Sequence, residues 1–398
     1  MKTPSYVFYE KIFKDTVNAV KEMLGDNIPL CYSIKANPFL LNCVPDNLAK
    51  IEVCSPGELS ICQKLNIPAE RIIYSGVMKE AVDVKRAVDY DVAIMTAESP
   101  LHLKLENEAC LERGLCKKVI LRLSSGNQFG MSQEDIINLV ENKEDYPGVN
   151  IIGLHYYSGT QKKLRSIDKD LKRLEETLVI LKERFGFEPE LVEYGPGLTI
   201  DYFQPEMAEN DRKALEEGAK RIRAFAEKYP MGIEMGRFLA SACGVFFTQV
   251  KDLKTTKGVN YVICDGGIHH LKYYGQTMAM LIPPIATGAS IEDLAKLNGD
   301  IAPLDSSEEV AEGNDEYCLC GSLCTVADVL VRNVRLKKLS VGDVIAFGKC
   351  GAYSVTEGSS LFLSRDLPAI YLARESGEME LLRDIQPSYI LNIQEEAK

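Results

Sequence analysis

The stretch Ile28-Pro-Leu-Cys-Tyr-Ser-Ile-Lys-Ala-Asn37 is a short apolar run that ends in a lysine and is followed by a proline. Its composition predicts a β-strand that carries Lys35 to its carboxyl end. A primary amine at that place, partly desolvated by Ile34 and Ala36, is expected to have a lowered pKa and to form a Schiff base with an aldehyde. The alternative is an ordinary surface lysine, so the interpretation depends on the rest of the chain.

Short β-rich runs alternate with amphipathic stretches from this point onward, and eight such units are found. Eight β/α units predict a TIM barrel, an α/β fold in which functional groups lie at the carboxyl ends of the strands. The expected helices include Pro56 to Leu65, Met78 to Tyr90, Ser132 to Asn142, Ile167 to Phe185 and Pro205 to Lys228. The expected strands are Pro29 to Ile34, Lys50 to Cys54, Arg71 to Ser75, Asp91 to Thr96, Lys118 to Leu123, Asn150 to Tyr157, Leu191 to Tyr194 and Met231 to Met235.

After about Cys243 the pattern changes to strands joined by turns, which predicts an all-β, barrel-like C-terminal domain. We therefore expect an N-terminal segment over 1–27, a barrel over 28–244 and a β domain over 245–398. The strand Ser5 to Tyr9 is expected to pair into the β domain, and the acidic stretch Asp305 to Asp315 is expected to be a loop. The predicted strands of this domain are Val245 to Lys251, Asn260 to Cys264, Met278 to Leu281, Glu316 to Leu319, Val344 to Phe347 and Ala369 to Leu372, with one helix over Ser290 to Leu297.

Composition narrows the possible partners. A chain of 398 residues with 46% apolar residues and a net charge of -12 is expected to bind a small molecule and no nucleic acid. We find no export signal and no membrane-spanning stretch, which predicts a cytoplasmic protein without a membrane partner. The twelve cysteines lack the spacing of a disulfide framework or of a zinc site, so we expect reduced thiols and no metal.

Two glycine turns follow neighbouring strands of the predicted barrel. Gly195 and Gly197 could let backbone amides approach an anion such as phosphate, although tight turns also need glycine. In Gly153-Leu-His-Tyr-Tyr-Ser-Gly-Thr-Gln161, the hydroxyl of Thr160 could add a phosphate donor. Strand alternation places Tyr157 nearer the carboxyl end, where it could stack on a flat ring, and predicts that His155 is a satisfied core histidine.

An acid and a fixed cation, Glu234 and Arg237, end the eighth run in Glu-Met-Gly-Arg. This pair suits a cofactor that carries both a basic ring nitrogen and a phosphate; the alternative is a local ion pair. The basic stretch Lys162 to Arg173 is interpreted as a solvated helix face, with docking of an acidic protein as the less favoured alternative.

The ordered motifs resemble those of the fold type III pyridoxal-phosphate decarboxylases, which include diaminopimelate and ornithine decarboxylases. The resemblance covers about Pro4 to Leu372 and implies a barrel, a C-terminal β domain and a homodimer with shared active sites. The motifs are Tyr32-Ser-Ile-Lys35-Ala-Asn, Gln128-Phe-Gly130, Gly153-Leu-His, Gly195-Pro-Gly, Glu234-Met-Gly-Arg, Gly321-Ser-Leu-Cys324-Thr-Val-Ala-Asp328 and Gly351-Ala-Tyr353.

The resemblance also implies a role for each matching residue. Lys35 would hold pyridoxal 5'-phosphate as the internal aldimine, and Glu234 would pair with the pyridinium nitrogen, which favours decarboxylation. Cys324 of the partner subunit would protonate the quinonoid carbon after carbon dioxide leaves. The residues that would hold the phosphate are Gly195, Gly197, Thr160, Arg237 and Tyr353.

Three positions depart from the family pattern. The usual stacking histidine is Tyr157, the usual proline of Glu-Pro-Gly-Arg is Met235, and the acidic residue that normally follows the cysteine is Thr325. In diamino-acid decarboxylases that acid meets the distal ammonium of the substrate. A neutral hydroxyl forfeits a charge-assisted hydrogen bond worth roughly 1.5–3 kcal/mol, so a cationic distal group is disfavoured.

Within the family, the sequences around residues 153–161, 265–276 and 323–325 are most similar to the branch that decarboxylates a glutamyl group carried on an acyl carrier protein. His269, His270, Tyr273 and Tyr274 would then line the substrate entrance, and the basic stretch would dock the carrier; packing is an equal alternative for the two histidines. The competing hypotheses are a meso-diaminopimelate decarboxylase that makes L-lysine and a non-catalytic cofactor-binding pseudoenzyme.

Overall fold

The computed structural model describes residues 1–304 and 313–394, and the chain divides into two compact units. The barrel unit comprises Thr16–Ile200 and Asn210–Leu239. The sheet unit comprises Met1–Asp15, Asp201–Glu209 and Ala240–Lys398. The domain limits expected after residues 27 and 244 concern independently folding domains, and they stay a prediction.

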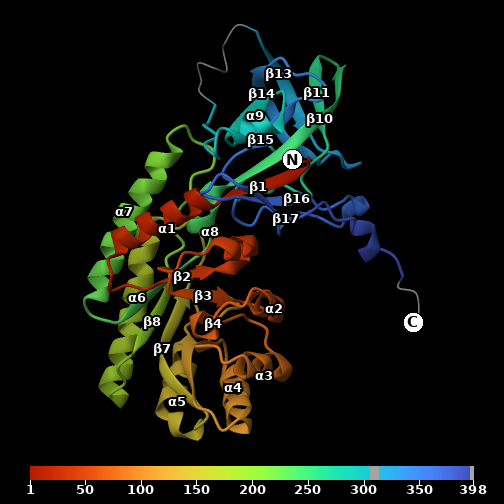
Figure 1. Ribbon diagram of the computed structural model, residues 1–398. Coiled ribbons are helices and arrows are strands. Elements are labelled where there is room, and N and C mark those ends of the chain that lie inside the picture. Colours follow the sequence, from red (N-terminus) through yellow and green to blue (C-terminus); the bar gives the residue numbers. More distant parts are fainter. Residues whose placement is uncertain (305–312, 395–398) are drawn as a thin grey trace. The chain divides into compact units, whose positions relative to one another are not determined.

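Eight parallel strands close the barrel in sequence order, as predicted (Figure 1). All eight apolar runs form strands, so the expected TIM-type architecture is confirmed. The strands are β2 (Leu30–Ser33), β3 (Lys50–Val53), β4 (Ile72–Tyr74), β5 (Ile94–Ala97), β6 (Lys117–Arg122), β7 (Val149–Tyr157), β8 (Leu191–Gly195) and β9 (Met231–Met235).

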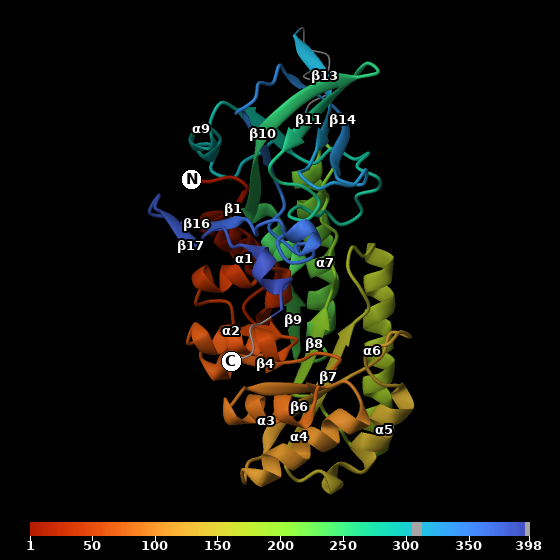
Figure 2. The same ribbon diagram turned by 90° about the vertical axis from the view of Figure 1, so that its right-hand side faces the viewer.

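Helices follow the barrel strands and surround them (Figures 1 and 2). Local chemistry sets their ends: the Ser55 side chain accepts from the backbone of Glu58 at the start of α2, and Gly186 takes a left-handed conformation after α6. None of the helices in the described parts of the chain is long and apolar enough to cross a membrane. The helices are α1 (Glu10–Leu24), α2 (Pro56–Lys64), α3 (Ala81–Asp89), α4 (Pro100–Glu112), α5 (Gln133–Glu141), α6 (Leu164–Phe185), α7 (Met207–Ala226) and α8 (Arg237–Ala240).

An apolar cluster fills the interior of the barrel. Its members come from strands that are not all neighbours, so they meet inside the closed sheet rather than on its outer face. This packing fixes the strands, and hence the positions of the polar side chains in the interior. The cluster consists of Cys31, Ile73, Ile94, Ile120 and Ile152.

The sheet unit contains a nine-stranded sheet among the described residues. As predicted, β1 (Ser5–Tyr9) joins this sheet, where it pairs antiparallel with β10 and parallel with β16. The helix α9 (Ile291–Ala295) lies within the predicted helical range. The other strands are β10 (Gly244–Thr256), β11 (Val259–Cys264), β12 (Ile285–Gly288), β13 (Asn314–Cys320), β14 (Val329–Lys337), β15 (Val344–Phe347), β16 (Ala369–Ala373) and β17 (Met379–Arg383).

One predicted strand of this unit is wrong. The run Met278 to Leu281 forms a turn in which the amide of Met280 donates to the carbonyl of Thr277, and Met278 and Ala279 have positive φ angles. Its methionines are exposed, so the apolar run is not a buried strand. The strands β12, β14 and β17 were not predicted, and most of the loop expected from Asp305 to Asp315 lies outside the described residues.

Candidate active site

Lys35 lies just beyond the carboxyl end of its strand. The strand β2 ends at Ser33, and the chain continues in a 3-10 turn over Ile34–Ala36. The side chain of Asn37 accepts from the amide of Phe39 and caps the next turn. The two turns therefore hold the backbone around Lys35, whose side chain is one-third exposed.

The ammonium of Lys35 is surrounded by two buried carboxylates and a thiol. Its Nζ lies 3.0 Å from Oε2 of Glu52 and 3.7 Å from Oε1 of Glu234. The Sγ of Cys54 lies 3.5 Å from the same nitrogen. The Lys35 amine is partly exposed, whereas the two carboxylates beside it are buried. It can therefore react with a carbonyl that arrives from solvent.

Glu234 receives a partner on each carboxylate oxygen. Ser33 Oγ donates to Oε1 at 3.0 Å, and the ring Nε2 of His155 lies 3.1 Å from Oε2. Burial by itself would raise the pKa of Glu234, but the charge of Lys35 and the hydrogen bond from His155 outweigh it and hold that pKa well below its usual range. The surroundings of Glu234 therefore favour its ionised form.

The sixth barrel strand, β7, supplies two aromatic rings to this cluster. His155 is buried, and its Nε2 lies against Glu234, so His155 belongs to the candidate site. Its Nδ1 has no hydrogen-bond partner among the described residues, so the prediction of a satisfied core histidine is wrong. The ring centroid of Tyr157 lies 5.9 Å from Nζ of Lys35, within reach of a cation–π contact. Burial raises the pKa of the Tyr157 phenol, which keeps the ring neutral.

The two glycine turns are in direct contact with each other. A Cβ on Gly197 would fall 2.0 Å from the carbonyl oxygen of Gly159, and Gly197 has a positive φ angle. A Cβ on Gly195 would fall 2.6 Å from the ring of Tyr157. No larger residue fits either position without movement, so the two turns can approach each other this closely only with glycine at both positions.

Two further donors lie together next to one of these turns. Nε of Arg237 donates to Oγ1 of Thr160 at 3.3 Å, although the two residues are far apart in the sequence. Arg237 opens the short helix α8, directly after the barrel strand that carries Glu234. A guanidinium, a hydroxyl and glycine turns form a donor set that suits a phosphate group.

Sequence reasoning missed Glu52 and Cys54, which contact Lys35 and each other; Cys54 Sγ lies 3.1 Å from Oε1 of Glu52. A signal was available, because Glu52 is a carboxylate between the apolar residues Ile51 and Val53 of a short strand. It also missed Arg122, which pairs with buried Glu98 in the barrel unit. Each of these roles depends on a neighbour from another strand or from a loop.

The remaining predicted site residues belong to the sheet unit. Cys324 is exposed in the loop between β13 and β14, and Thr325 follows it. The carboxylate of Asp328 fixes this loop, because it accepts from the amides of Leu323 at 2.7 Å and Ile268 at 2.8 Å. The loop that carries Cys324 is thereby tied to the 265–276 segment.

The residues expected to line a substrate entrance lie in the 265–276 segment, and they differ in their exposure to solvent. His269 and His270 are buried with their ring centroids 3.7 Å apart, so their surroundings favour the packing alternative. Tyr273 is buried and donates to the carbonyl of Gly348, whereas Tyr274 is about half exposed. Tyr353 lies in a turn with a positive φ angle of 66°.

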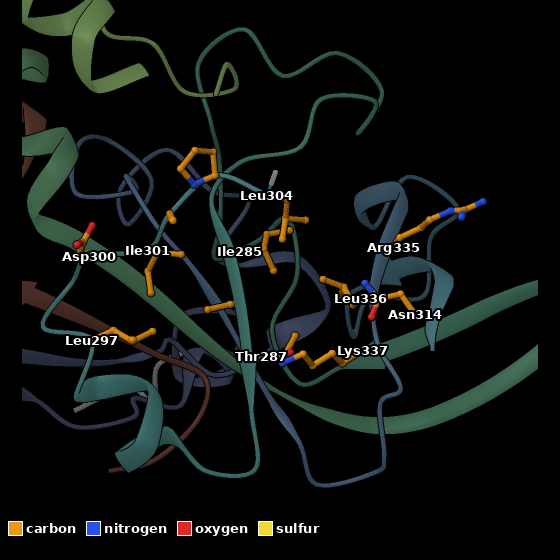
Figure 3. A pocket seen from close by; sticks show the side chains of 13 residues that line it. Ile285, Thr287, Leu297, Asp300, Ile301, Leu304, Asn314, Arg335, Leu336 and Lys337 are labelled. Atoms are coloured by element: carbon orange, nitrogen blue, oxygen red, sulfur yellow. The ribbon is translucent and has the colours of Figure 1, made fainter. Parts of the chain in front are cut away.

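A cavity of about 370 Å³ lies elsewhere in the sheet unit (Figure 3). Figure 3 shows Leu297 and Ile301 on one side of it and polar side chains from β13 and β14 on the other. None of the predicted site residues lines it. The polar residues on the strand side are Asn314, Arg335 and Lys337.

Residues 10–241 match the family model of the pyridoxal-dependent decarboxylases, pyridoxal binding domain. The chain belongs to this family. It is 25% identical to the L-glutamyl-[BtrI acyl-carrier protein] decarboxylase of Niallia circulans, over 96% of this chain and 91% of that protein. It is 26% identical to the diaminopimelate decarboxylase of Aquifex aeolicus, over 96% of this chain and 89% of that protein.

The solved structure of diaminopimelate decarboxylase from M. jannaschii shows the same fold. It superposes with a TM-score of 0.82 and 23% identity, over 100% of this chain and 93% of that one. The predicted family and fold are therefore confirmed, and the protein is a carboxy-lyase that uses pyridoxal phosphate. The amine, anion and glycine turns of the barrel unit have the chemistry that this cofactor requires.

Proposed function

We propose that this decarboxylase removes the α-carboxylate of an amino acid, or of an aminoacyl group such as glutamyl on an acyl carrier protein. The observation that carries the reaction type is Glu234, a buried anion 3.7 Å from the amine of Lys35 with its other oxygen on His155. An anion at this place keeps a basic ring nitrogen protonated. Pyridoxal phosphate, when bound, supplies the electron sink into which the electrons of the broken carbon–carbon bond move.

Different residues of the chain would bind different parts of the cofactor. Lys35 attaches the aldehyde, and Glu52 holds the amine in place through a contact of 3.0 Å. Tyr157 would cover the face of the cofactor ring and exclude water from it. The phosphate end would be held by Gly195, Gly197, Thr160, Arg237 and Tyr353.

The loop around Cys324 supports a substrate without a distal ammonium. Thr325 stands where an acid would be needed, and its hydroxyl accepts from the backbone of Ala327 at 3.3 Å. The acid of this loop, Asp328, is buried and occupied by two backbone amides. Neither residue offers a carboxylate to a cationic substrate.

The carrier-bound alternative agrees with the relative from Niallia circulans, an L-glutamyl-[BtrI acyl-carrier protein] decarboxylase, and with the exposure of Tyr274. The proposed docking face on α6 needs one correction, because Lys162 is buried and paired with Asp170 and cannot contact a partner. The exposed cations of that face are Lys163, Arg165, Lys169, Lys172 and Arg173.

Mass spectrometry of product formation tests the substrate class. We expect carbon dioxide loss from a glutamyl-loaded carrier protein or a neutral amino acid, and little lysine from meso-diaminopimelate. The matched variant Thr325→Asp restores an acid and should raise kcat/KM for diaminopimelate about tenfold or more, because a charge-assisted hydrogen bond returns. Efficient lysine production by the unchanged protein would instead establish the diaminopimelate alternative.

We further propose a cytoplasmic homodimer in which Cys324 serves the partner's site as the acid. The twelve cysteines are free, which suits a reducing compartment. Two 3-10 turns of the sheet unit expose an apolar patch of the kind that partners cover. The patch comprises Leu361, Phe362, Leu363, Tyr389, Ile390 and Leu391. Sedimentation at increasing protein concentration tests whether the protein is a dimer.

The variant Cys324→Ala tests the proposed acid. It should keep the absorbance of the bound cofactor, while turnover or product fidelity falls.

A further inference from the structure

Lys162 is a buried lysine beside the two glycine turns, and no role is yet assigned to it. Its side chain is 6% exposed. Nζ donates to Oδ2 of Asp170 at 2.6 Å and to the carbonyl of Gly195 at 3.3 Å. Asp170 also accepts from the hydroxyls of Ser158 and Tyr194, so the carboxylate has several partners.

The backbone of Lys162 joins the same two turns. Its amide donates to the carbonyl of Gly197 at 2.9 Å, and its carbonyl accepts from Oγ1 of Thr199 at 2.9 Å. The side chain of the preceding residue, Gln161, bonds both the amide and the carbonyl of Ile200. Main chain and side chain therefore hold the turn around residue 159 against the turn around residue 196.

The ammonium also lies against aromatic rings. Nζ is 5.5 Å from the ring centroid of Tyr157 and 5.4 Å from that of Tyr194. Burial lowers the pKa of Lys162, and the bond to Asp170 acts in the opposite direction. A buried ion pair is costly compared with apolar packing, so a lysine here is better explained by the geometry that it fixes than by stability.

We propose that Lys162 is a positioning residue that holds the two glycine turns together as one phosphate-binding site. This inference rests on the proposed placement of the cofactor phosphate at these turns. Preorganised donors bind an anion more tightly because they need no ordering at the moment of binding. The effect should therefore fall on the phosphate end of the cofactor, while attachment of the aldehyde by Lys35 is little affected.

The test compares pyridoxal phosphate with pyridoxal, which has the aldehyde and lacks the phosphate. Dissociation constants of both are measured by absorbance titration of the cofactor-free protein and of Lys162→Met. We expect the variant to lose about tenfold or more of the affinity for pyridoxal phosphate and no more than about twofold of that for pyridoxal. The ratio of the dissociation constants for the two ligands would not change if the substitution only destabilised the barrel, because both ligands would then bind less tightly by the same factor.

Lys79 provides a matched control. It is also a buried lysine of the barrel unit that donates to two backbone carbonyls, those of Gly76 and Thr96. Lys79→Met should affect both ligands equally. If Lys162→Met does not fold, the same ratio is measured on Lys162→Gln, which keeps a polar donor of shorter reach.

The outcomes separate the two proposals. An unchanged preference for pyridoxal phosphate in a folded Lys162 variant overturns the positioning role and leaves the proposed function intact. Equal weakening of both ligands also overturns it. If the unchanged protein shows no preference for the phosphorylated ligand, the phosphate site itself is wrong, and the role of Lys162 fails with it.

Discussion

Two layers of the barrel interior each contain a buried glutamate, and the surroundings shift the pKa values of the two carboxyl groups in opposite directions. Glu234, on β9, has Lys35 and His155 beside it and a strongly lowered pKa. Glu193, on β8, lies in register with Gly232 and hence one layer nearer the amino ends of the strands. Burial, together with the nearby anions Glu234 and Glu52, raises the pKa of Glu193 to about 8.

The difference shows that a cation, rather than exposure, decides where this barrel keeps a charge. Both carboxyl groups are almost completely inaccessible to water. A hydrogen bond with the Cys31 thiol and the charge of Lys50 lower the pKa of Glu193 by less than burial and the two anions raise it, and one of its oxygens has no hydrogen-bond partner among the described residues. The upper layer therefore stabilises the anion of Glu234, which the proposed reaction uses. In the lower layer, ionisation of Glu193 costs free energy because the carboxylate is buried.

The largest effect is expected when the charge of the upper layer is removed. Glu234→Gln keeps the shape and an acceptor for Ser33 but removes the anion, so kcat/KM should fall by about 10²–10³-fold, as for other preorganised electrostatic groups. Glu193→Gln is the control and should retain the activity of the unchanged protein. Steady-state decarboxylation assays measure both, and near-normal activity in Glu234→Gln would contradict the proposed role.

A smaller effect is expected when the titratable carboxyl group of the lower layer, Glu193, is removed. Between about pH 4.5 and pH 8 the folded protein keeps the Glu193 proton that the unfolded chain has lost, so stability falls as pH rises through this window. Glu193→Gln removes that loss and should raise the free energy of unfolding by roughly 1–3 kcal/mol at pH 8. Urea unfolding at pH 5 and pH 8 measures it; an equal change at both values would count against a titrating Glu193.

The sequence predicted the parts of the molecule that depend on local pattern. Eight apolar runs specify the barrel, and Lys35 and Glu234 stand out because each ends such a run in a recognisable motif. The site contacts of Glu52 and Lys162 could not be predicted, because their partners come from other strands or from the following helix. The failed strand at Met278 has the same cause, since only tertiary packing decides whether an apolar run is buried.

Outside the strands, Glu106 on α4 provides an intermediate case. It is fully buried, and neither of its carboxylate oxygens has a hydrogen-bond partner among the described residues. Burial raises its pKa to about 7, while buried Lys79 acts in the opposite direction and limits the rise. Glu106 thus resembles Glu193 in burial and Glu234 in having a lysine nearby.

The smallest effect is therefore expected from Glu106→Gln. Stability is lost as pH rises from about 4.5 to 7, and the substitution removes this loss, but it also takes from Lys79 the anion that favours its charged form. The two changes oppose each other, so the gain at pH 8 should stay below about 1 kcal/mol. The same urea series measures it beside Glu193→Gln. A gain as large as that of Glu193→Gln would mean that a neighbouring lysine does not compensate a buried carboxylate in this barrel, and the contrast between the two layers would need another cause.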